Sequence, residues 1–526
     1  MDPFLLLFIG LTVVLGGILL LRLHPFLALF TAALLISAIT PNQQVVEALT
    51  AKYTNEHIKD LESKGDKLDP TEQKKIIQAQ LKKAENYSQK TPIKRITTEF
   101  GVTCGKIGIV IALACLIGRC LLASGAADRI VRAALGLVGE KGAPIAFLAS
   151  GFTLGIPVFF DSLFLLAIPL AKAMWLKLRK NYLLLIVALI AGGAMTHSLV
   201  PPTPGPLYVA DALNVDLGTM IIAGLIVGIF TSGAGYLYGM WLNQRIDIPF
   251  RETPESIAKL EALSEKKIED LPSLFTSLLP IILPVLLIAG GTLISQIDAP
   301  IALKNFFSVV GDKNIALAIA AAIALYTLST RLEDKKELGE QMQDALTEAG
   351  LIILICCAGG AFGSILLQTG IGPHLQSKVG ENIDPIWLLP LAFIVTTAIR
   401  AAQGSATVAM ITTVGIVGGF ATMNLGYHPV YLALAIGCGS KPLPWMNDSG
   451  FWVISKMSGM TEKELMNAMT LLSRSPRDAR KPRDLGRFGL GLKTAAISQA
   501  RRLTVITRPK GGGRFLRCWD LDYLAK

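Results

Sequence analysis

Long apolar windows without charged residues recur along most of the chain. The first, Phe4–Leu21, has 18 residues, and the longest, Ala401–Ser440, has 40. A helix rises 1.5 Å per residue, so about 20 residues cross a hydrocarbon core of about 30 Å. The windows are continuous rather than alternating, which is typical of helices and not of membrane β-barrels. The pattern predicts an all-α polytopic membrane protein of roughly a dozen complete or partial spans.

Polar stretches interrupt these windows. Residues 43–95 form a lysine-rich insertion with helix-forming segments, and Asp247–Asp270 and Arg331–Asp344 are shorter charged connections. The loop Lys172–Lys180 holds basic residues and no acid, so the positive-inside rule predicts that it faces the cytoplasm. Phe4–Leu21 has no basic region before it and no A-x-A site after it, so we expect a transmembrane helix and not a cleaved signal.

Composition agrees with this pattern. Hydrophobic residues make up 52% of the 526 residues and charged residues 17%, whereas soluble domains carry about 25% charge. A soluble enzyme, a disordered scaffold and a disulfide-rich secreted module are therefore disfavoured. The net charge of +11 resides almost entirely in Ser473–Lys526, which has 14 Lys and Arg against 4 Asp and Glu. The nearly neutral body gives no reason to expect a nucleic-acid partner.

The seven cysteines form no C-x-x-C pair, and most lie in apolar runs. We interpret them as small core residues rather than as disulfides or metal ligands. The body also has no metal cluster, nucleophile triad or phosphate loop, so the sequence predicts neither a cofactor nor an enzyme.

An internal repeat divides the apolar region. Ile117–Gly125 aligns with Phe362–Gly370 at an offset of 245 residues, and at the same offset Gly192 meets Gly437 and Gly205 meets Gly450. Chance similarity between Gly- and Leu-rich segments is the alternative. We predict repeats at about 107–240 and 349–472, arranged as the inverted repeats that build many secondary transporters.

Each repeat contains a segment that cannot continue as a regular helix. Met195–Pro206 has four prolines in six residues, and Gly439–Gly450 contains Pro442 and Pro444. Non-helical backbone at membrane depth survives only inside protein or beside a wet cavity. The paired interruptions therefore predict a transport site formed by broken or re-entrant segments, although two extramembrane loops would give the same pattern.

Charges within apolar windows indicate which side chains could serve such a site. Asp161 follows 19 uncharged residues, and Arg400 lies between uncharged runs of 15 and 40 residues. Such residues normally face a partner or a watery path. Asp161 could exchange a proton and Arg400 could bind a carboxylate, unless both lie at helix ends at the membrane interface. His197 is a candidate proton relay or a core histidine, and Ala401–Met410 offers amide and hydroxyl groups to a polyhydroxylated ligand.

Four runs resemble the gluconate permease family: GIPVFFDSLF, THSLVPPTPGP, IRAAQGSATVAM and NDSGFW. The resemblance covers about residues 1–41 and 97–470. It implies a multi-pass permease of the bacterial inner membrane that couples uptake of gluconate or a related small hydroxy-carboxylate to protons. D-serine carriers are relatives, so D-serine or another hydroxy acid is an alternative substrate. The other implied partner is the lipid bilayer, and a homo-oligomer is compatible with the sequence.

The family's motif positions supply the candidate site residues. For substrate binding they are Arg400, Gln403, Ser405, Thr407, Thr203, Asn447 and Ser449. For proton coupling they are Asp161, Asp448 and His197. The division between the two roles is a hypothesis.

The chain departs from the family pattern near its end. Family members continue into a final membrane helix, but here Leu465–Leu472 gives way to Ser473-Arg474-Ser475-Pro476. We therefore predict a transmembrane domain over 1–472 and a basic tail over 473–526. The run Gly486–Ala495, followed by a predicted strand at Arg501–Val505, resembles a fragment of the ATPase domain shared by gyrase, heat-shock chaperones and histidine kinases. A membrane-anchored nucleotide-binding regulator is thus an alternative function, although the Asn-bearing helix and D-x-G-x-G loop of that domain are missing.

Overall fold

The computed structural model describes residues 1–21, 23–63, 70–265, 268–332, 334–371, 374, 384–418, 425–442, 444, 448–469, 502–507 and 515–520. The chain divides into two compact units, Met1–Leu472 and Ser473–Lys526. All the regular secondary structure in the described part of unit 1 is helical, which confirms the predicted all-α membrane fold.

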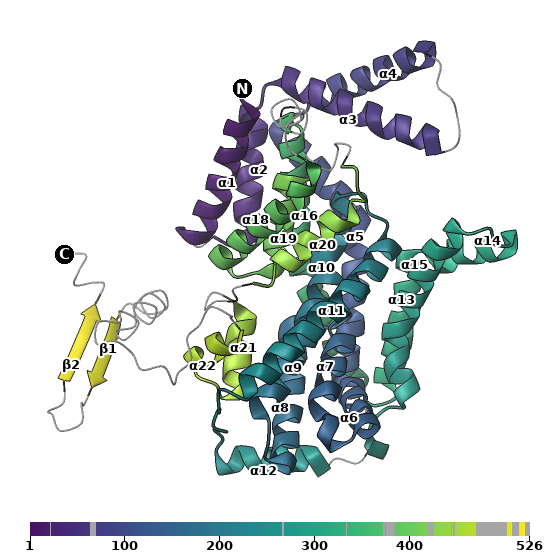
Figure 1. Cartoon of the computed structure of the whole chain (residues 1–526). Coiled ribbons are helices and arrows are strands. Elements are labelled where there is room, and N and C mark those ends of the chain that lie inside the picture. Colours follow the sequence, from purple (N-terminus) through teal and green to yellow (C-terminus); the bar gives the residue numbers. More distant parts are fainter. Residues whose placement is uncertain are drawn as a thin grey trace. The chain divides into compact units, whose positions relative to one another are not determined.

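The helices of unit 1 up to the middle of the chain follow one another with short connections (Figure 1). They are α1 Pro3–Leu19, α2 Pro25–Ile39, α3 Asn42–Ser63, α4 Pro70–Ser88, α5 Pro92–Ala123, α6 Ala126–Val138, η1 Glu140–Gly142, α7 Ala143–Leu154, α8 Phe160–Leu178, α9 Tyr182–Leu199, α10 Pro204–Ala212, α11 Leu217–Asn243 and α12 Pro254–Glu265.

The second half continues with helices of similar composition. They are η2 Ile268–Asp270, α13 Leu274–Gln296, α14 Ile301–Val310, α15 Lys313–Ser329, α16 Lys335–Leu367, η3 Pro385–Trp387, α18 Leu388–Gln403, α19 Ala406–Val417, α20 Val430–Gly439, α21 Ser449–Ser458 and α22 Glu462–Met469.

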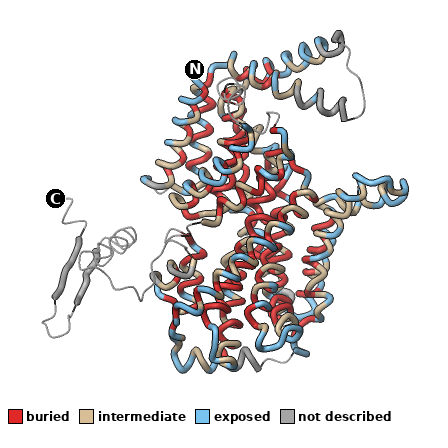
Figure 2. The backbone as a smooth tube through the Cα atoms, in the orientation of Figure 1, coloured by how far each residue is buried: buried red, intermediate tan, exposed pale blue. Residues whose placement is uncertain are grey.

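Six helical stretches among the described residues are long and apolar enough to cross a membrane, and counting two bent helix pairs as single spans raises the number to eight. Shorter apolar helices include α19 and α20, which account for partial spans. The stretch Tyr182–Ala212 is 94% buried over its apolar window. It is apolar on all sides because it lies in the centre of unit 1, where Figure 2 shows most of the buried residues.

The helix bounds follow the offset of 245 residues found in the sequence. α5 corresponds to α16, α7 to α18, α8 to α19 and α10 to α21, and each pair begins within two residues of that offset. The helix breaks correspond as well. At this offset Thr203, the N-cap of α10, aligns with Asp448, the N-cap of α21.

Glycine allows the central helices to approach one another closely. A Cβ added at Gly151 of α7 would lie 2.6 Å from the Leu189 carbonyl oxygen of α9, and one at Gly192 of α9 would overlap the Leu148 carbonyl oxygen of α7. Close backbone approach through small residues is the usual means of packing membrane helices.

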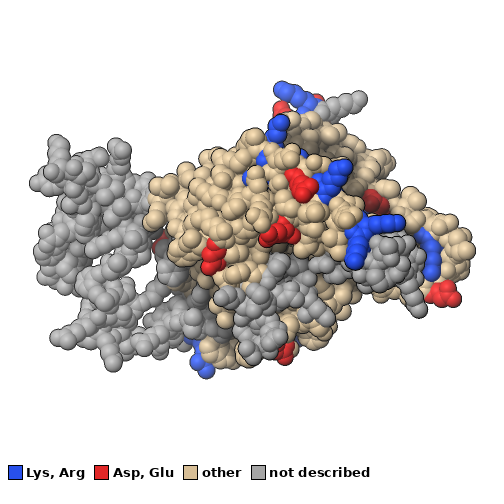
Figure 3. Space-filling view, turned by 90° about the horizontal axis from the view of Figure 1, so that it is seen from above, with Lys and Arg blue, Asp and Glu red and all other residues tan. Residues whose placement is uncertain are grey.

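The lysine-rich insertion forms a helical hairpin, α3 and α4. The first part of α3 is bent by 107° from α2, and the hairpin lies at the end of unit 1 opposite α6 and α12 (Figure 1). Tyr87 of α4 donates a hydrogen bond of 2.6 Å to the Glu99 carboxylate of α5, and burial raises the pKa of Tyr87 above its usual value. Basic and acidic side chains lie side by side on this face (Figure 3), so it is no single-sign patch.

Unit 2 contains two described strands, β1 Arg502–Thr507 and β2 Phe515–Asp520. They pair antiparallel, with Arg502 opposite Asp520 and Thr507 opposite Phe515. β1 overlaps the strand predicted at Arg501–Val505. The glycine-rich run Gly486–Ala495 lies outside the described residues.

Candidate functional site

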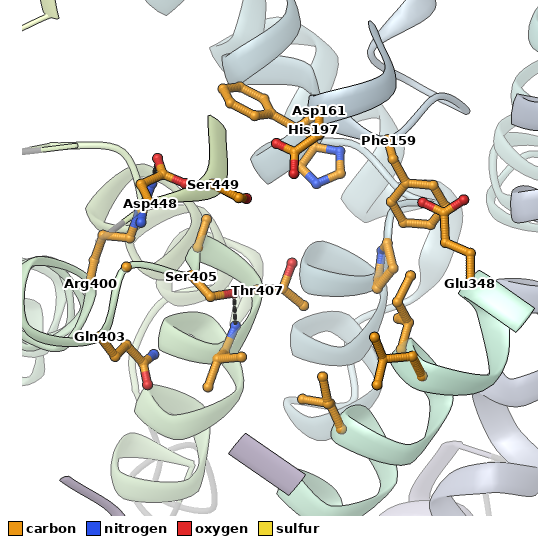
Figure 4. A pocket seen from close by; sticks show the side chains of 18 of the residues that line it. Phe159, Asp161, His197, Glu348, Arg400, Gln403, Ser405, Thr407, Asp448 and Ser449 are labelled. Atoms are coloured by element: carbon orange, nitrogen blue, oxygen red, sulfur yellow. Dashed lines mark hydrogen bonds and ion pairs between the residues drawn. The ribbon is translucent and has the colours of Figure 1, made fainter. Parts of the chain in front are cut away.

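A cavity of about 430 Å³ lies where broken segments of both halves of unit 1 meet (Figure 4). Its volume falls within the range of about 300–1,000 Å³ typical of small-molecule sites. Its walls come from the start of α8, the end of α9, the start of α10, one face of α16, the α18–α19 break and the segment before α21. The two interruptions also touch directly, since the Ser440 hydroxyl donates a 3.0 Å hydrogen bond to the Ser198 hydroxyl.

Four helices begin at this cavity. Their N-caps are Phe159 for α8, Thr203 for α10, Ser405 for α19 and Asp448 for α21. The first N–H groups of a helix have no partner within the helix, and the macrodipole adds partial positive charge there. The dipoles of these N-termini therefore favour an anion in the cavity, although the Val408 and Gly450 N–H groups already bond to Ser405 and Asp448.

Arg400 and Asp448 form a buried ion pair on one wall. Arg400 is 4% exposed and Asp448 is 7% exposed. Nη2 of Arg400 donates to Oδ2 of Asp448 at 2.5 Å, and Nε donates to the Ser440 carbonyl at 3.1 Å. Oδ1 of Asp448 accepts from the Gly450 N–H at 3.1 Å, so this carboxylate also caps α21. The pair thus fixes the second broken segment against α18.

Several polar atoms at the cavity have no hydrogen-bond partner among the described residues. They are Nη1 of Arg400, Nδ1 of His197, and both Nε2 and Oε1 of Gln403. Buried polar groups are normally satisfied. These atoms therefore leave both donors and acceptors for a polar ligand.

Asp161 and Lys441 face the same space from the two halves. Asp161 is hydrogen-bonded to the side chain of Ser449, and the Lys441 ammonium lies 4.9 Å from the ring centroid of Phe160. A cation over an aromatic face is stabilised without neutralising its charge. Lys441 thus offers an ammonium to a bound anion.

Figure 4 shows how the labelled residues are distributed. Arg400, Asp448 and Ser449 lie on one side of the cavity, and Glu348 and Phe159 on the other, with Asp161 and His197 between them. The rings of Phe159 and Phe160 lie 6.3 Å and 6.1 Å from the His197 ring, between centroids.

Most of the sequence-predicted residues line this cavity: Asp161, His197, Arg400, Gln403, Ser405, Thr407, Asp448 and Ser449. Ser405 accepts from the Val408 N–H at 3.3 Å and so also caps α19. Thr203 is 3% exposed, donates to the Val200 carbonyl at 2.7 Å and does not line the cavity, although the next residue, Pro204, does. Asn447 lies outside the described residues. The roles assigned to all these residues stay predictions.

Two charged lining residues were missed by sequence reasoning, Glu348 and Lys441. Glu348 directly precedes an apolar window and Lys441 directly follows one, so the sequence pattern placed each of them at the polar end of a span. α16 begins at Lys335, so Glu348 is well inside the helix. The position of Lys441 beside the predicted Pro442 break was the available signal. No group of metal-ligating side chains occurs within the described chain.

Comparison with known proteins gives two family matches. A model described as GntP family permease matches residues 83–474. A model described as histidine kinase-, DNA gyrase B- and HSP90-like ATPase matches residues 446–526.

Similar individual proteins cover most of unit 1. An uncharacterized permease of Haemophilus influenzae is 36% identical, over 70% of this chain and 77% of its own length. A gluconate permease of Pseudomonas aeruginosa is 33% identical, over 72% and 84%. The Gnt-II system L-idonate transporter of Escherichia coli is 29% identical, over 74% and 87%. The crystal structure of the Alcanivorax borkumensis YdaH transporter aligns with a TM-score of 0.48 at 15% identity, over 71% of this chain and 83% of its own.

Proposed function

Because this chain belongs to the GntP permease family, as a multi-pass transporter of the bacterial inner membrane, we propose that it takes up gluconate or a related small hydroxy-carboxylate together with protons. Relatives named as gluconate permeases and an L-idonate transporter support this substrate class. The sequence motifs that contain Asp161, His197 and Arg400 resemble those of the same family and support the same substrate class.

The observation on which this proposal rests is the set of titratable groups that line the cavity. They are the carboxyl groups of Asp161, Glu348 and Asp448, the basic side chains of Arg400 and Lys441, and the imidazole of His197. A substrate carboxylate adds a further negative charge. Binding a proton to one of these carboxylates would offset that charge, which gives a physical reason for co-transport.

Substrate binding follows from the groups without partners. The substrate carboxylate is held by Lys441 and Nη1 of Arg400, together with N–H groups of the helix N-termini. The amide of Gln403 and the hydroxyls of Ser405, Thr407 and Ser449 meet the substrate hydroxyls. Asp161, Asp448 and His197 are the candidates for the coupling proton that the sequence motifs supply, and Glu348 adds a further titratable group to the same cavity. Asn447 belongs to the same proposal on its sequence motif alone.

Alternating access uses the two halves. The matching helix starts and N-caps at the offset of 245 residues support a duplicated unit with broken helices at equivalent positions. In inverted-repeat transporters, rocking of one repeat against the other exposes a site between them to each side in turn. We expect the same motion here, with the cavity between the repeats.

Uptake of labelled gluconate into proteoliposomes tests the proposal. Uptake should be driven by an inward proton gradient and should fall to equilibration when a protonophore collapses that gradient. Asp161→Asn tests the candidate from the sequence, because loss of the driven component with counterflow intact would assign the coupling proton to Asp161 and not to another carboxylate of the cavity. Uptake that ignores the gradient would exclude proton coupling, and no accumulation of any hydroxy acid would exclude this transport function. Competition by unlabelled L-idonate or D-serine identifies the preferred substrate.

A second candidate rests on the match of residues 446–526 to an ATPase family. In this reading the tail binds a nucleotide and regulates unit 1. Titration of the purified full chain with a fluorescent ATP analogue tests it. Saturable binding that ATP displaces would support regulation, and a flat titration would exclude it.

A further inference from the structure

One face of α16 leads from an exposed surface to the cavity. Gln341, Asp344 and Glu348 follow one another at helical spacing, and Leu351, Ile352 and Ile355 continue the same face as cavity lining. Residues three and four apart lie above one another on a helix, with about 5–6 Å between their Cβ atoms. Glu348 is therefore the innermost polar residue of a polar strip.

The outer part of this strip is held by Arg119 of α5. Its Nε donates to Oε1 of Gln341 at 2.6 Å, and its Nη2 donates to Oδ2 of Asp344 at 2.7 Å. The side chains of Arg119 and Asp344 are 35% and 60% exposed. The Asp344 carboxylate is thus in contact with water, one helical turn from Glu348.

The Glu348 carboxylate itself has no hydrogen bond or ion pair to another described residue. The titratable and charged groups around it are Arg119 and the Cys115 thiol on α5, Asp344 on α16, and Asp161 across the cavity on α8. The other two carboxylates of the cavity are occupied, because Asp448 pairs with Arg400 and Asp161 contacts Ser449. Among the three carboxylates of the cavity, Glu348 is therefore the one that can gain or lose a proton without breaking a hydrogen bond or ion pair to a described residue.

The polar strip lies toward one side of the membrane. α5 ends beside α6, and α6, α12 and the end of α8 share one end of unit 1 (Figure 1). The loop predicted at Lys172–Lys180 is wrong in its bounds, because α8 runs to Leu178 and only Arg179 and Lys180 lie beyond it. These basic residues at the end of α8 predict that this end faces the cytoplasm. Asp344, the exposed carboxylate of the strip, lies one turn closer to that end of α16 than Glu348 does.

We propose that Glu348 is the carboxylate that carries the coupling proton between the cavity and the cytoplasmic side, with Arg119 and Asp344 as positioning residues of the exit path. The inference rests on the proton-coupled function proposed above. Glu348 binds a proton from water in the cavity when the substrate anion binds. After the substrate leaves, the O–H bond breaks and the proton passes through water beside Asp344 to the cytoplasm, which restores the carboxylate.

The test measures protons and substrate together on the full chain in detergent. Gluconate is added to lightly buffered protein with a pH indicator, and bound gluconate is counted in parallel. Wild type should take up protons on binding. Glu348→Gln should still bind gluconate and exchange it in counterflow, while taking up about one proton fewer per molecule bound. Glu340→Gln is the matched control, an exposed carboxylate on the same helix that does not line the cavity.

The outcomes separate this inference from the function beneath it. Wild type that binds no gluconate, or binds it without taking up protons, overturns the proposed function and this inference with it. Wild type and E348Q with equal proton uptake overturn only the role of Glu348. Loss of gluconate binding in E348Q, when E340Q still binds, makes Glu348 a binding residue and also overturns the inference.

A second variant keeps the inference testable if E348Q aggregates. Glu348→Asp retains a carboxylate with shorter reach, so proton uptake should persist while the pH profile of gradient-driven uptake is displaced. An unchanged profile with unchanged proton uptake would show that the position of this carboxylate is irrelevant to coupling. Counterflow serves as the reference, since exchange of substrate alone needs no proton release.

Discussion

At the residue scale, the two basic residues of the cavity differ in their partners. Lys441 has no ion pair to another described residue, whereas Arg400 is paired with Asp448. A hydrogen bond to a charged group contributes about 1.5–3 kcal/mol. We expect Lys441→Met to raise the KM for gluconate uptake roughly tenfold or more, because 1.4 kcal/mol corresponds to tenfold in affinity.

Lys456→Met is the control for that variant. Lys456 is an exposed basic residue near the end of α21, away from the cavity. Its removal should leave KM unchanged within experimental scatter. Equal KM values for both variants and wild type would exclude Lys441 from carboxylate binding.

The Arg400–Asp448 pair gives a prediction about stability. Removing one partner of a buried ion pair leaves the other charge uncompensated, at a cost of about 3–5 kcal/mol. Asp448→Asn keeps an oxygen that can cap α21 but removes the charge that compensates Arg400, so we expect a clear fall in the thermal unfolding temperature of the detergent-purified protein. Asp211→Asn is the comparison, because Asp211 belongs to a partly exposed pair with Lys106 at 3.4 Å, where about 0–1 kcal/mol is at stake. Equal effects would contradict the structural role of the buried pair.

Individual residues also show what the sequence could reveal of the site. Asp161 and Arg400 stood out because they interrupt long apolar windows. Glu348 and Lys441 did not, because each is next to the edge of a window and the edge of a helix cannot be located to within a turn from hydropathy. Gln403 and His197 have polar atoms without hydrogen-bond partners among the described residues. This feature depends on tertiary packing, so no local sequence pattern could predict it.

At the element scale, the contact between α7 and α9 depends on glycine. A Cβ at Gly192 would overlap the Leu148 carbonyl oxygen, which belongs to the backbone and cannot rotate away. Overpacking of this kind costs about 1–3 kcal/mol. We expect Gly192→Ala to lower the unfolding temperature and the yield of folded protein.

Gly233→Ala is the matched control for helix packing. Gly233 lies within α11, and a Cβ there meets no atom within 4 Å. Alanine is the better helix former by about 0.5–1 kcal/mol, so this variant should be neutral or slightly stabilised. Destabilisation of both variants by the same amount would contradict close packing as the cause.

The short helix α22 is tied to the connection after α11. Arg251 binds the Glu464 carboxylate through two hydrogen bonds of 2.7 Å and 2.8 Å, and it also donates to the Gly459 carbonyl at 3.0 Å. Glu464 in turn accepts from the Thr461 N–H at 2.8 Å, as in a capping box. The hydrogen bonds from Arg251 lower the pKa of Glu464 to about 2.

This lowered pKa makes the contribution of Glu464 dependent on pH. An unfolded glutamate has a pKa of about 4.3, so the stabilisation is present above that pH and is lost as pH falls toward 2. Because Arg251 is 40% exposed, we expect only about 1 kcal/mol. The difference in unfolding free energy between wild type and Glu464→Gln should be present at pH 7 and shrink below about pH 4. A difference that grows on acidification would contradict this sign.

The elements were predictable to different degrees. The apolar windows predicted most spans, and proline marked the breaks before α10 and within Gly439–Gly450, because both signals are local. The first predicted span, Phe4–Leu21, corresponds in the structure to α1 Pro3–Leu19. The 107° bend between α2 and α3 was not predicted, since the direction of an insertion depends on contacts such as that between Tyr87 and Glu99.

At the scale of the whole molecule, the site belongs to both halves of unit 1. Neither half holds a complete set of groups. Asp161 and His197 come from the first predicted repeat, and Arg400, Gln403 and Lys441 come from the second. Helix N-termini from both halves border one cavity, and the side chains that stand at the offset of 245 residues differ. Thr203 and Asp448 occupy equivalent caps, but only Asp448 can carry a charge.

The same scale predicts the effect of removing the tail. Every residue that lines the cavity lies within Met1–Leu472, and α22, which the Arg251–Glu464 pair secures, ends at Met469. A chain ended after Leu472 should therefore accumulate gluconate at the wild-type rate. A chain ended after Gly459 loses Glu464 together with the buried side chains of Met460 and Leu465, and it should be less stable. Proteoliposome uptake and thermal unfolding of both truncations measure these effects. Loss of uptake in the longer truncation, with its unfolding temperature unchanged, would instead assign the ATPase-like tail a direct part in transport.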